Sequence, residues 1–232
     1  MRPRLIITID GPAGAGKSTL GRRLAQSLGY LYLDSGALYR AVAWQSGQAG
    51  VNPDDADGLE AYLEHFAPQV EADPQGFHLS VNGRRLTWEL RTPETTRDSS
   101  RVAIQPAVRR WVLRQLRDLA GDGGVVAEGR DMGSVVFPEA QVKFYLEAGL
   151  EVRAARRKRQ WQNQGEAVAL EGVQEELARR DRRDETRSHA PLTVPQGAVC
   201  LDTSNLEADQ IFHICLRHIR KILEGGGLNP EH

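Results

Sequence analysis

Residues 11–19 read "GPAGAGKST" and follow directly on the run "LIITID" at residues 5–10, which is apolar up to Asp10. A loop that wraps a phosphate turns its backbone N–H groups inward, and glycine permits both the dihedral angles and the close approach. A helix beginning near Lys17 would direct its positive end at the same point. The alternative is a glycine-rich turn that merely opens a helix. The strand before it and the helix after it favour a phosphate-binding loop (P-loop), whose pattern G-x-x-x-x-G-K-[ST] is matched at Gly11, Gly16, Lys17 and Ser18.

The P-loop pattern assigns a chemical role to each part of the stretch. We expect Lys17 to supply positive charge to the β- and γ-phosphates of a nucleotide, and the hydroxyl of Ser18 to hold Mg²⁺. Thr19 is a second candidate for the metal. The expected ATP-binding residues are Gly11, Pro12, Ala13, Gly14, Ala15, Gly16, Lys17, Ser18 and Thr19.

Short apolar runs alternate with helical patterns along the chain, which predicts an α/β fold. None of the runs alternates with polar residues, as expected of strands that helices cover on both faces. The segment 67–92 differs, because its alternating residues flank an Asn82-Gly83 turn signal and predict a small antiparallel insertion. The five predicted strands of the main sheet are residues 5–9, 30–33, 124–127, 142–146 and 198–201.

Composition narrows the class of protein. The 232 residues are 40% apolar and 26% charged with a formal net charge of -1, which excludes a polybasic coat for nucleic acid or membranes. No apolar run approaches the roughly 18 residues of a membrane span, and the N-terminus does not resemble a signal peptide. Only two cysteines occur, Cys200 and Cys215, and we expect two buried thiols in a reducing cytoplasm.

Polar clusters follow the second and third predicted strands, where ligands gather in open α/β sheets. "LDSGALYR" places Asp34, Ser35 and Arg40 there, and "VVAEGRDMG" places Glu128, Arg130 and Asp131. Two arginine-dense helical stretches follow, and a guanine-reading N-K-x-D is missing from the sequence. These features favour a small-molecule kinase, with a nucleotide-gated binding protein as the alternative.

Taken in order, the motifs resemble those of the bacterial cytidylate kinases, a branch of the P-loop nucleoside monophosphate (NMP) kinases. The likeness covers residues 4–222 and is carried by "GPAGAGKST", "LDSGALYR", "RTPE…SS", "EGRDMGSVVFP" and "RRDRRDETRSHAPL". It implies one three-layer P-loop kinase domain over 1–232, with an inserted NMP-binding subdomain at 67–104 and a short helical lid at 151–187. Two departures are mild: Glu128 is Asp in some members, and relatives often have Gly at the position of Ser18.

The resemblance implies transfer of the γ-phosphoryl group of ATP to CMP or dCMP, in pyrimidine nucleotide metabolism, with Mg²⁺. Because the acceptor phosphate is already a nucleophile, catalysis is mostly positioning and neutralisation of charge. The implied catalytic residues are Lys17, Arg130, Arg153, Arg156 and Arg157, of which the last three contact the donor phosphates. The implied CMP-binding residues are Ser35, Arg40, Ser100, Arg109, Arg130, Asp131, Arg180, Asp184 and Arg187.

Among the CMP-binding residues, the resemblance implies a division of labour. Arg40, Arg130 and Arg187 hold the CMP phosphate with Ser35 nearby, while Arg180 and Asp184 contact the ribose. Ser100, Arg109 and Asp131 read cytosine: the carboxylate accepts from the N4 amine, and the other two donate to N3 and O2.

Several alternatives stay open. The arginines of 180–187 also suit a solvated, salt-bridged helix face. Glu128 suits both a carboxylate that orders Mg²⁺ waters and a structural hydrogen-bond acceptor. A kinase acting on an alcohol such as shikimate would have no phosphate for the converging arginines. We expect a monomer that binds neither nucleic acid nor membrane.

Overall fold

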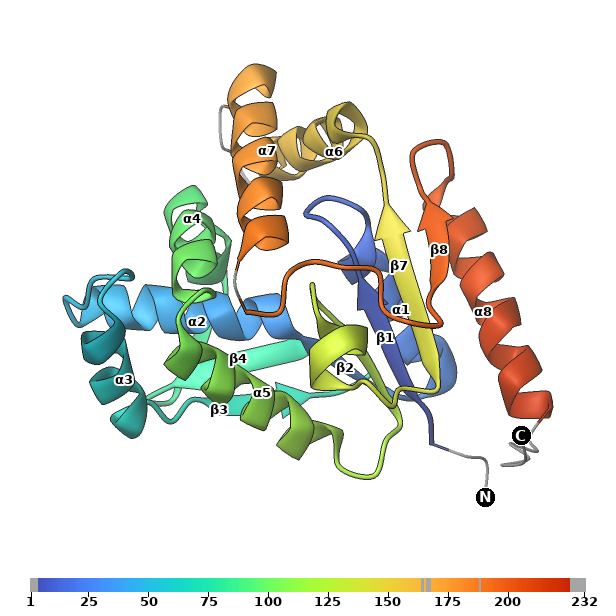
Figure 1. Ribbon diagram of the computed structural model, residues 1–232, viewed down its shortest axis with the longest axis horizontal. Coiled ribbons are helices and arrows are strands. Elements are labelled where there is room, and N and C mark those ends of the chain that lie inside the picture. Colours follow the sequence, from blue (N-terminus) through green and yellow to red (C-terminus); the bar gives the residue numbers. More distant parts are fainter. Residues whose placement is uncertain (1–3, 164, 166–167, 188, 226–232) are drawn as a thin grey trace.

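The computed structural model describes residues 4–163, 165, 168–187 and 189–225, and its main element is a five-stranded parallel sheet (Figure 1). All four strand pairings are parallel, and β1 lies in the middle. The carboxyl end of β1, where the P-loop begins, is therefore central on one edge of the sheet. This confirms the predicted fold. The strand order is β2 (Leu31–Asp34), β6 (Val125–Glu128), β1 (Ile6–Asp10), β7 (Val142–Glu147) and β8 (Val199–Asp202).

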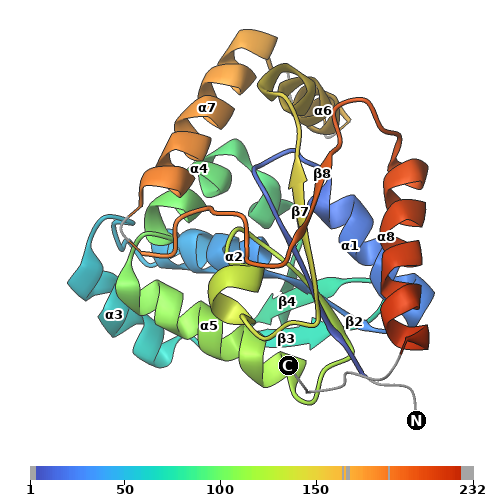
Figure 2. The same cartoon turned by 45° about the vertical axis from the view of Figure 1, so that its right-hand side comes forward.

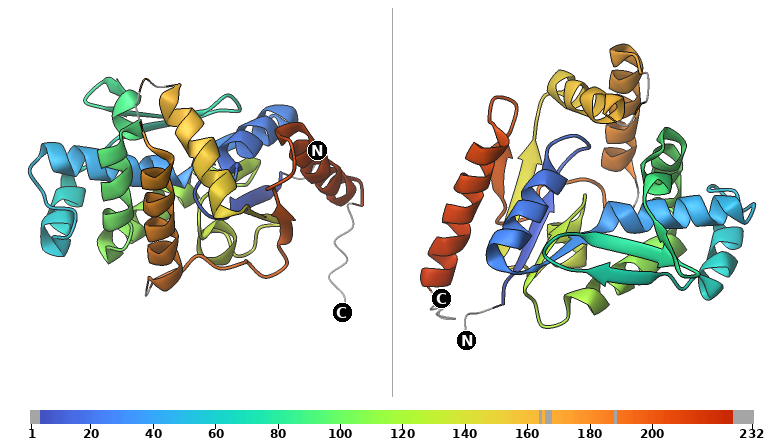
Figure 3. Two further views of the ribbon diagram at one scale, coloured as in Figure 1. Left: turned by 90° about the horizontal axis from the view of Figure 1, so that it is seen from above. Right: turned by 180° about the vertical axis from the view of Figure 1, so that it is seen from behind.

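Helices cover both faces of this sheet and make three layers (Figure 3). On one face, α1 (Lys17–Leu28) and α8 (Ala208–Glu224) pack against β1 and β7. On the other, α2 (Ser35–Gln48) and α5 (Pro106–Ala120) pack against β2 and β6. Successive side chains of β6 pack into the hydrophobic clusters on opposite faces of the sheet. The strand is therefore buried on both faces, which explains why its sequence is an uninterrupted apolar run.

The segment 67–92 forms the predicted antiparallel meander of β3 (Gln69–Ala72), β4 (Phe77–Val81) and β5 (Arg84–Leu86). Asn82 and Gly83 both have positive φ, 51° and 74°, as a tight hairpin turn requires. The meander lies between α3 (Ala56–His65) and the 3-10 helix η1 (Trp88–Arg91), which leads into α4 (Pro93–Val102).

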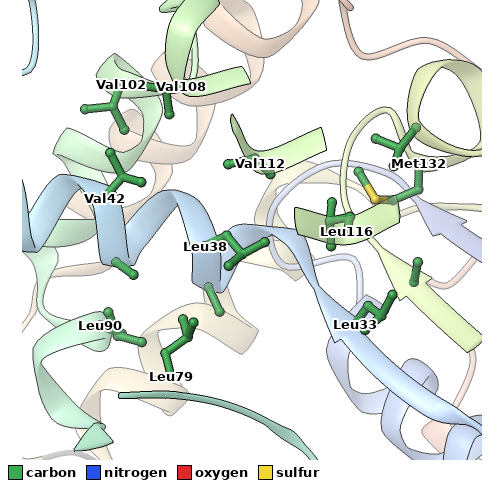
Figure 4. Packing of buried hydrophobic residues seen from close by; sticks show 14 of the residues in the cluster. Leu33, Leu38, Val42, Leu79, Leu90, Val102, Val108, Val112, Leu116 and Met132 are labelled. Carbon is green, nitrogen blue, oxygen red and sulfur yellow. The ribbon is translucent and has the colours of Figure 1, made fainter. Parts of the chain in front are cut away.

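The meander shares its core with the main sheet. Leu79 of β4 is buried in the same cluster as Leu38 of α2, Leu33 of β2 and Leu116 of α5 (Figure 4). The small sheet is therefore packed on α2, the helix that begins at the carboxyl end of β2.

Two further helices, α6 (Leu150–Gln162) and α7 (Leu170–Thr186), stand over the carboxyl edge of the sheet (Figure 2). Ala13 of the P-loop is buried against them, with Ala154 and Trp161 of α6 and Val173 and Leu177 of α7. The pair therefore packs directly on the loop.

The expectation of two buried thiols is confirmed for Cys215 and wrong for Cys200. Cys215 of α8 is buried, and burial raises the pKa of its thiol to about 12. Cys200 is exposed because exposure alternates along β8: Val199 and Leu201 pack against the core, and Cys200 lies on the opposite face. Across the described ranges, no helix combines the length and the apolar character that spanning a bilayer requires.

The shared core predicts a large effect of truncating Leu116, which is fully buried. Leu116→Ala should lower the free energy of unfolding by about 2–5 kcal/mol, measured by urea denaturation, because it leaves a cavity between α5 and the sheet. Ile104→Ala is the control, since Ile104 is 40% exposed, and should change stability by about 1 kcal/mol or less. Equal losses in the two variants would contradict the assignment of this core.

Candidate active site

The P-loop is held tightly by its neighbours. A Cβ atom at Gly11 would stand 2.0 Å from the carbonyl oxygen of Leu146 in β7, and the φ of Gly11 is 140°. A Cβ atom at Gly14 would stand 3.0 Å from the Cβ of Arg153 in α6. These two glycines are thus required by the packing of the loop itself, in addition to any phosphate that the loop wraps.

Lys17 is the first residue of α1 and is buried beneath the loop. Its Nζ donates to the carbonyl oxygen of Pro12 at 2.7 Å. Burial, and then the positive charge of Arg130, hold the pKa of the ammonium well below its ordinary value. A phosphate beside Lys17 would oppose the effect of Arg130, since an opposite charge favours the ammonium form.

Ser18 lies beside the buried carboxylate of Glu128, to which the hydroxyl of Tyr32 donates. Burial, and then the charge of Asp34, raise the pKa of Glu128, while Lys17 and the hydroxyls of Tyr32 and Ser18 oppose that rise. Glu128 therefore acts as a structural hydrogen-bond acceptor. Its alternative role, ordering the waters of Mg²⁺, stays a prediction.

The P-loop meets the predicted acceptor residues in one cavity of about 150 Å³. The loop contributes Ala13, Gly14, Lys17 and Ser18 to its wall. The remaining walls come from four helices and from the turn after β6. They supply nine of the predicted side chains: Ser35, Arg40, Ser100, Arg130, Asp131, Arg157, Arg180, Asp184 and Arg187.

Five guanidinium groups line this cavity, and three of them have a carboxylate within 4.0 Å. One of the three is Arg187, whose Nη2 lies 3.8 Å from Oδ2 of Asp131. Arg40 donates to Asp34 at 3.1 Å, and Arg130 donates to Asp184 at 2.9 Å. Asp184 is buried, yet Arg130 and Arg180 hold the pKa of its carboxyl below the usual range against the effect of burial.

The other two guanidinium groups, Arg157 and Arg180, have no carboxylate within 4.0 Å among the described residues. Burial lowers the pKa of each to about 10, and the next cause is a neighbouring guanidinium, Arg40 for Arg157 and Arg130 for Arg180. The buried Nε of Arg180 has no hydrogen-bond partner in the described part of the chain. This is an uncompensated cluster of positive charge, which is the condition for binding phosphate.

A second wall of the cavity carries hydrogen-bonding side chains around Asp131. The buried carboxylate of Asp131 pairs with Arg109, and its Oδ2 lies 3.8 Å from Nη2 of Arg187. The hydroxyl of Ser100, from α4, lines the same cavity. Hydrogen-bond acceptors and donors therefore line the same cavity as the cationic cluster.

The structure does not bring Arg153 and Arg156 into the cavity. Nη1 of Arg153 donates to Oδ2 of Asp181 at 2.6 Å and to the carbonyl oxygen of Ala13 at 3.2 Å, so Arg153 braces the P-loop from behind. Arg156 donates to the hydroxyl and carbonyl oxygens of Thr203 at 3.0 and 2.6 Å. Contact of these two residues with donor phosphates stays a prediction.

Six more predicted residues lie outside the walls of this cavity, namely Gly11, Pro12, Ala15, Gly16, Thr19 and Arg109. The first four complete the P-loop, and Thr19 is exposed on α1. Arg109 stands behind Asp131 and lines a larger cavity of about 610 Å³ beside α5. No P-loop residue lines that larger cavity, so the smaller one is the candidate active site.

Asp10, the last residue of β1, has a role that the motifs do not indicate. Its buried carboxylate accepts hydrogen bonds from the backbone N–H groups of Met132 at 2.8 Å and Gly133 at 2.7 Å. These residues begin a short π-helix, η2 (Met132–Val136), directly after Asp131. Asp10 thereby fixes the turn that carries Asp131. The one signal in the sequence is a carboxylate ending an otherwise apolar strand.

Burial raises the pKa of Asp10 from 3.8 to about 6, although its two backbone hydrogen bonds oppose the rise. The pKa of Asp10 is higher in the folded chain than in the unfolded chain, so the protonated carboxyl stabilises the fold. This contribution is fully present below about pH 4 and is lost as the pH rises through about 6. Asp10→Asn cannot titrate. The stability of the natural protein relative to this variant should therefore increase by about 1 kcal/mol between about pH 7.5 and about pH 5.

Urea denaturation at the two pH values measures this difference. The control is Asp122→Asn, which alters an exposed carboxylate. For the control, the difference from the natural protein should stay constant with pH. A pH-independent difference for Asp10→Asn would contradict the prediction.

Comparison with known proteins adds the family to this geometry. A family model described as cytidylate kinase matches residues 7–221. A cytidylate kinase of Coxiella burnetii is 40% identical over 222 residues, which cover 95% of this chain and 94% of that protein. A bifunctional pantoate ligase/cytidylate kinase of Synechococcus sp. is also 40% identical, over 97% of this chain and 42% of its own length.

Among solved structures, an uncharacterized protein from Eubacterium ventriosum is similar with a TM-score of 0.51 at 10% identity, covering 94% of this chain and 99% of that one. This likeness concerns the fold alone. The match of the family model over nearly the whole chain, and the relatives at 40% identity, are decisive: the chain belongs to the cytidylate kinase family.

Proposed function

We propose that this chain transfers the γ-phosphoryl group of ATP to the phosphate of CMP or dCMP, giving ADP and CDP or dCDP. The observation that carries the proposal is the convergence of the P-loop and five guanidinium groups on one cavity. A donor triphosphate and an acceptor phosphate bring a concentrated negative charge, which such a cluster balances. An alcohol acceptor would leave much of that positive charge without a counterpart.

On the donor side, the P-loop wraps the phosphates of ATP and Lys17 neutralises the β- and γ-phosphates. Arg157 is the lid residue best placed to join it, because its guanidinium already lines the cavity without a carboxylate partner among the described residues. Arg153 holds the loop through the carbonyl oxygen of Ala13.

On the acceptor side, Arg40, Arg130 and Arg187 hold the phosphate of CMP, with Ser35 beside them. Arg180 and Asp184 contact the ribose, and Asp131 accepts from the N4 amine of cytosine with Ser100 and Arg109 alongside. Uracil presents a carbonyl oxygen in place of that amine, so UMP should bind more weakly by about 1–3 kcal/mol.

The reaction needs no strong general base, because the acceptor phosphate is an anion and already a nucleophile. The protein's contribution is to align the two phosphates and to neutralise the charge shared between them. Closure of α6 and α7 over the cavity would exclude water and so prevent loss of ATP by hydrolysis.

Mg²⁺ fits this site through Ser18, whose hydroxyl lines the cavity next to the carboxylates of Asp34 and Glu128. The described residues contain no cluster of three metal-ligating side chains, which suits a cation held chiefly by phosphate oxygens and water. When bound, the ion would polarise the transferred phosphoryl group.

We also propose a single P-loop kinase domain over 1–232, with the NMP-binding insert at 67–104 and the lid at 151–187. Lid residues 164, 166 and 167 lie outside the described part of the chain. Acidic residues interleaved with the arginines of α7 favour nucleotides over nucleic acid as ligands. The monomeric state and the cytoplasmic location stay predictions.

Steady-state release of ADP from ATP, with a panel of acceptors, tests the proposed function. We expect rapid release with CMP or dCMP, slower release with UMP, and little with AMP or shikimate. Release that does not depend on any acceptor would favour the nucleotide-gated binding protein. A preference for shikimate would favour a kinase of alcohols, and either result would overturn the proposal.

Lys17→Ala should lower kcat by about 10²–10³-fold or more, because it removes a preorganised charge from the transferring phosphoryl group. The variant should remain folded, since the alanine leaves no unpaired charge, and a thermal melt checks this. Lys221→Ala, on the exposed face of α8, is the control and should keep the natural rate. Near-normal turnover in Lys17→Ala would contradict the role of the P-loop.

A further inference from the structure

We propose that Arg183 is a positioning residue that orients the hydroxyl of Ser100 and thereby sets the preference for cytosine over uracil. The inference rests on the proposed function and assigns a role to Arg183, which lies within the motif "RRDRRDETRSHAPL" but has no role in the predicted site and does not line the cavity. It starts from a contact between α7 and α4.

Nη1 of Arg183 donates to Oγ of Ser100, and the same Oγ bonds to the carbonyl oxygen of Arg97 at 2.9 Å. A guanidinium group can only donate hydrogen bonds, and a carbonyl oxygen can only accept them. The proton of the Ser100 hydroxyl must therefore point to Arg97, and one of its two lone pairs is occupied by Arg183. A single lone pair remains for a ligand.

Ser100 therefore faces the cavity as a hydrogen-bond acceptor. This differs from the expectation that its hydroxyl donates to N3 or O2 of the base. Together with the carboxylate of Asp131, the wall presents two acceptors. The N4 amine of cytosine offers two N–H donors to such a pair, whereas O4 of uracil is an acceptor and would be repelled.

Without Arg183 the Ser100 hydroxyl would no longer be held in this orientation. It could release the carbonyl oxygen of Arg97 and turn its proton toward O4 of uracil. The carbonyl group would keep its helical hydrogen bond, because Arg97 lies within α4. Removal of Arg183 should thus relax the choice between the two bases more than it weakens phosphate binding.

Arg183 has a matched neighbour for the experiment. Arg182 carries the same charge on the same helix, is exposed, and its side chain makes no hydrogen bond or ion pair with the described residues. Arg183→Gln and Arg182→Gln therefore remove equal charge, and only the first removes the bond to Ser100.

The measurement is the ratio of kcat/KM for CMP to kcat/KM for UMP. We expect about a tenfold fall in Arg183→Gln, the size of one lost hydrogen-bond preference, and no change in Arg182→Gln. Arg183→Lys keeps a side chain that donates hydrogen bonds and cannot accept them, so it should retain most of the natural CMP-to-UMP ratio. A natural ratio in Arg183→Gln, or an equal fall in Arg182→Gln, would overturn the proposal.

A double-mutant cycle with Ser100→Ala tests whether Arg183 acts through Ser100. If it does, adding Arg183→Gln to Ser100→Ala should change the ratio no further. Additive effects would show an independent action and would overturn the proposal. Failure of the proposed function looks different, because the natural protein would then show no CMP-dependent release of ADP at all.

Discussion

The candidate active site depends on holding several positively charged side chains close together although they repel one another. Arg130 disfavours the charged form of Lys17, and Arg40 disfavours the charged form of Arg157. Such a cluster lowers the stability of the folded chain unless anions or rigid neighbours offset it. Asp34 and Asp184 each pair with one arginine, and the parallel sheet holds the rest by directing several turns to a single edge. The residual charge is what remains for substrate phosphates.

Helix α7 is the element that joins the two halves of the site. On one side, Asp181 pairs with Arg153, which in turn donates to Ala13 of the P-loop. On the other side, Asp184 pairs with Arg130, one residue before Asp131. The P-loop and the turn that carries Asp131 are thus attached to the same stretch of backbone. A shift of α7 would move both sets of contacts together, which is a physical basis for coupling between these two parts of the cavity.

Much of the fold could be predicted from the sequence, because the signals for its strands and turns are local. The apolar runs report burial on both faces of the strands, and Asn82-Gly83 specifies its turn by the conformations those residues tolerate. The features that the sequence did not indicate depend on contacts between residues that lie far apart in the chain. Helical spacing places Arg153 and Arg157 on one face of α6, but the buried Asp181 draws Arg153 behind the P-loop while Arg157 reaches the cavity. The exposure of Cys200 follows from the face of β8 on which it lies, opposite to Val199 and Leu201, and the apolar run alone does not indicate that one face is left uncovered.

The central strand explains how the two halves keep their spacing. Asp10 binds the turn that carries Asp131, and the next residue, Gly11, begins the P-loop against the backbone of β7. One peptide bond therefore separates the anchor of the turn that carries Asp131 from the start of the P-loop. Burying a carboxylate there is unfavourable, as its raised pKa indicates. Its two backbone hydrogen bonds fix the register of that turn, and in a reaction that consists mainly of alignment, a fixed distance between donor and acceptor is what the chemistry requires.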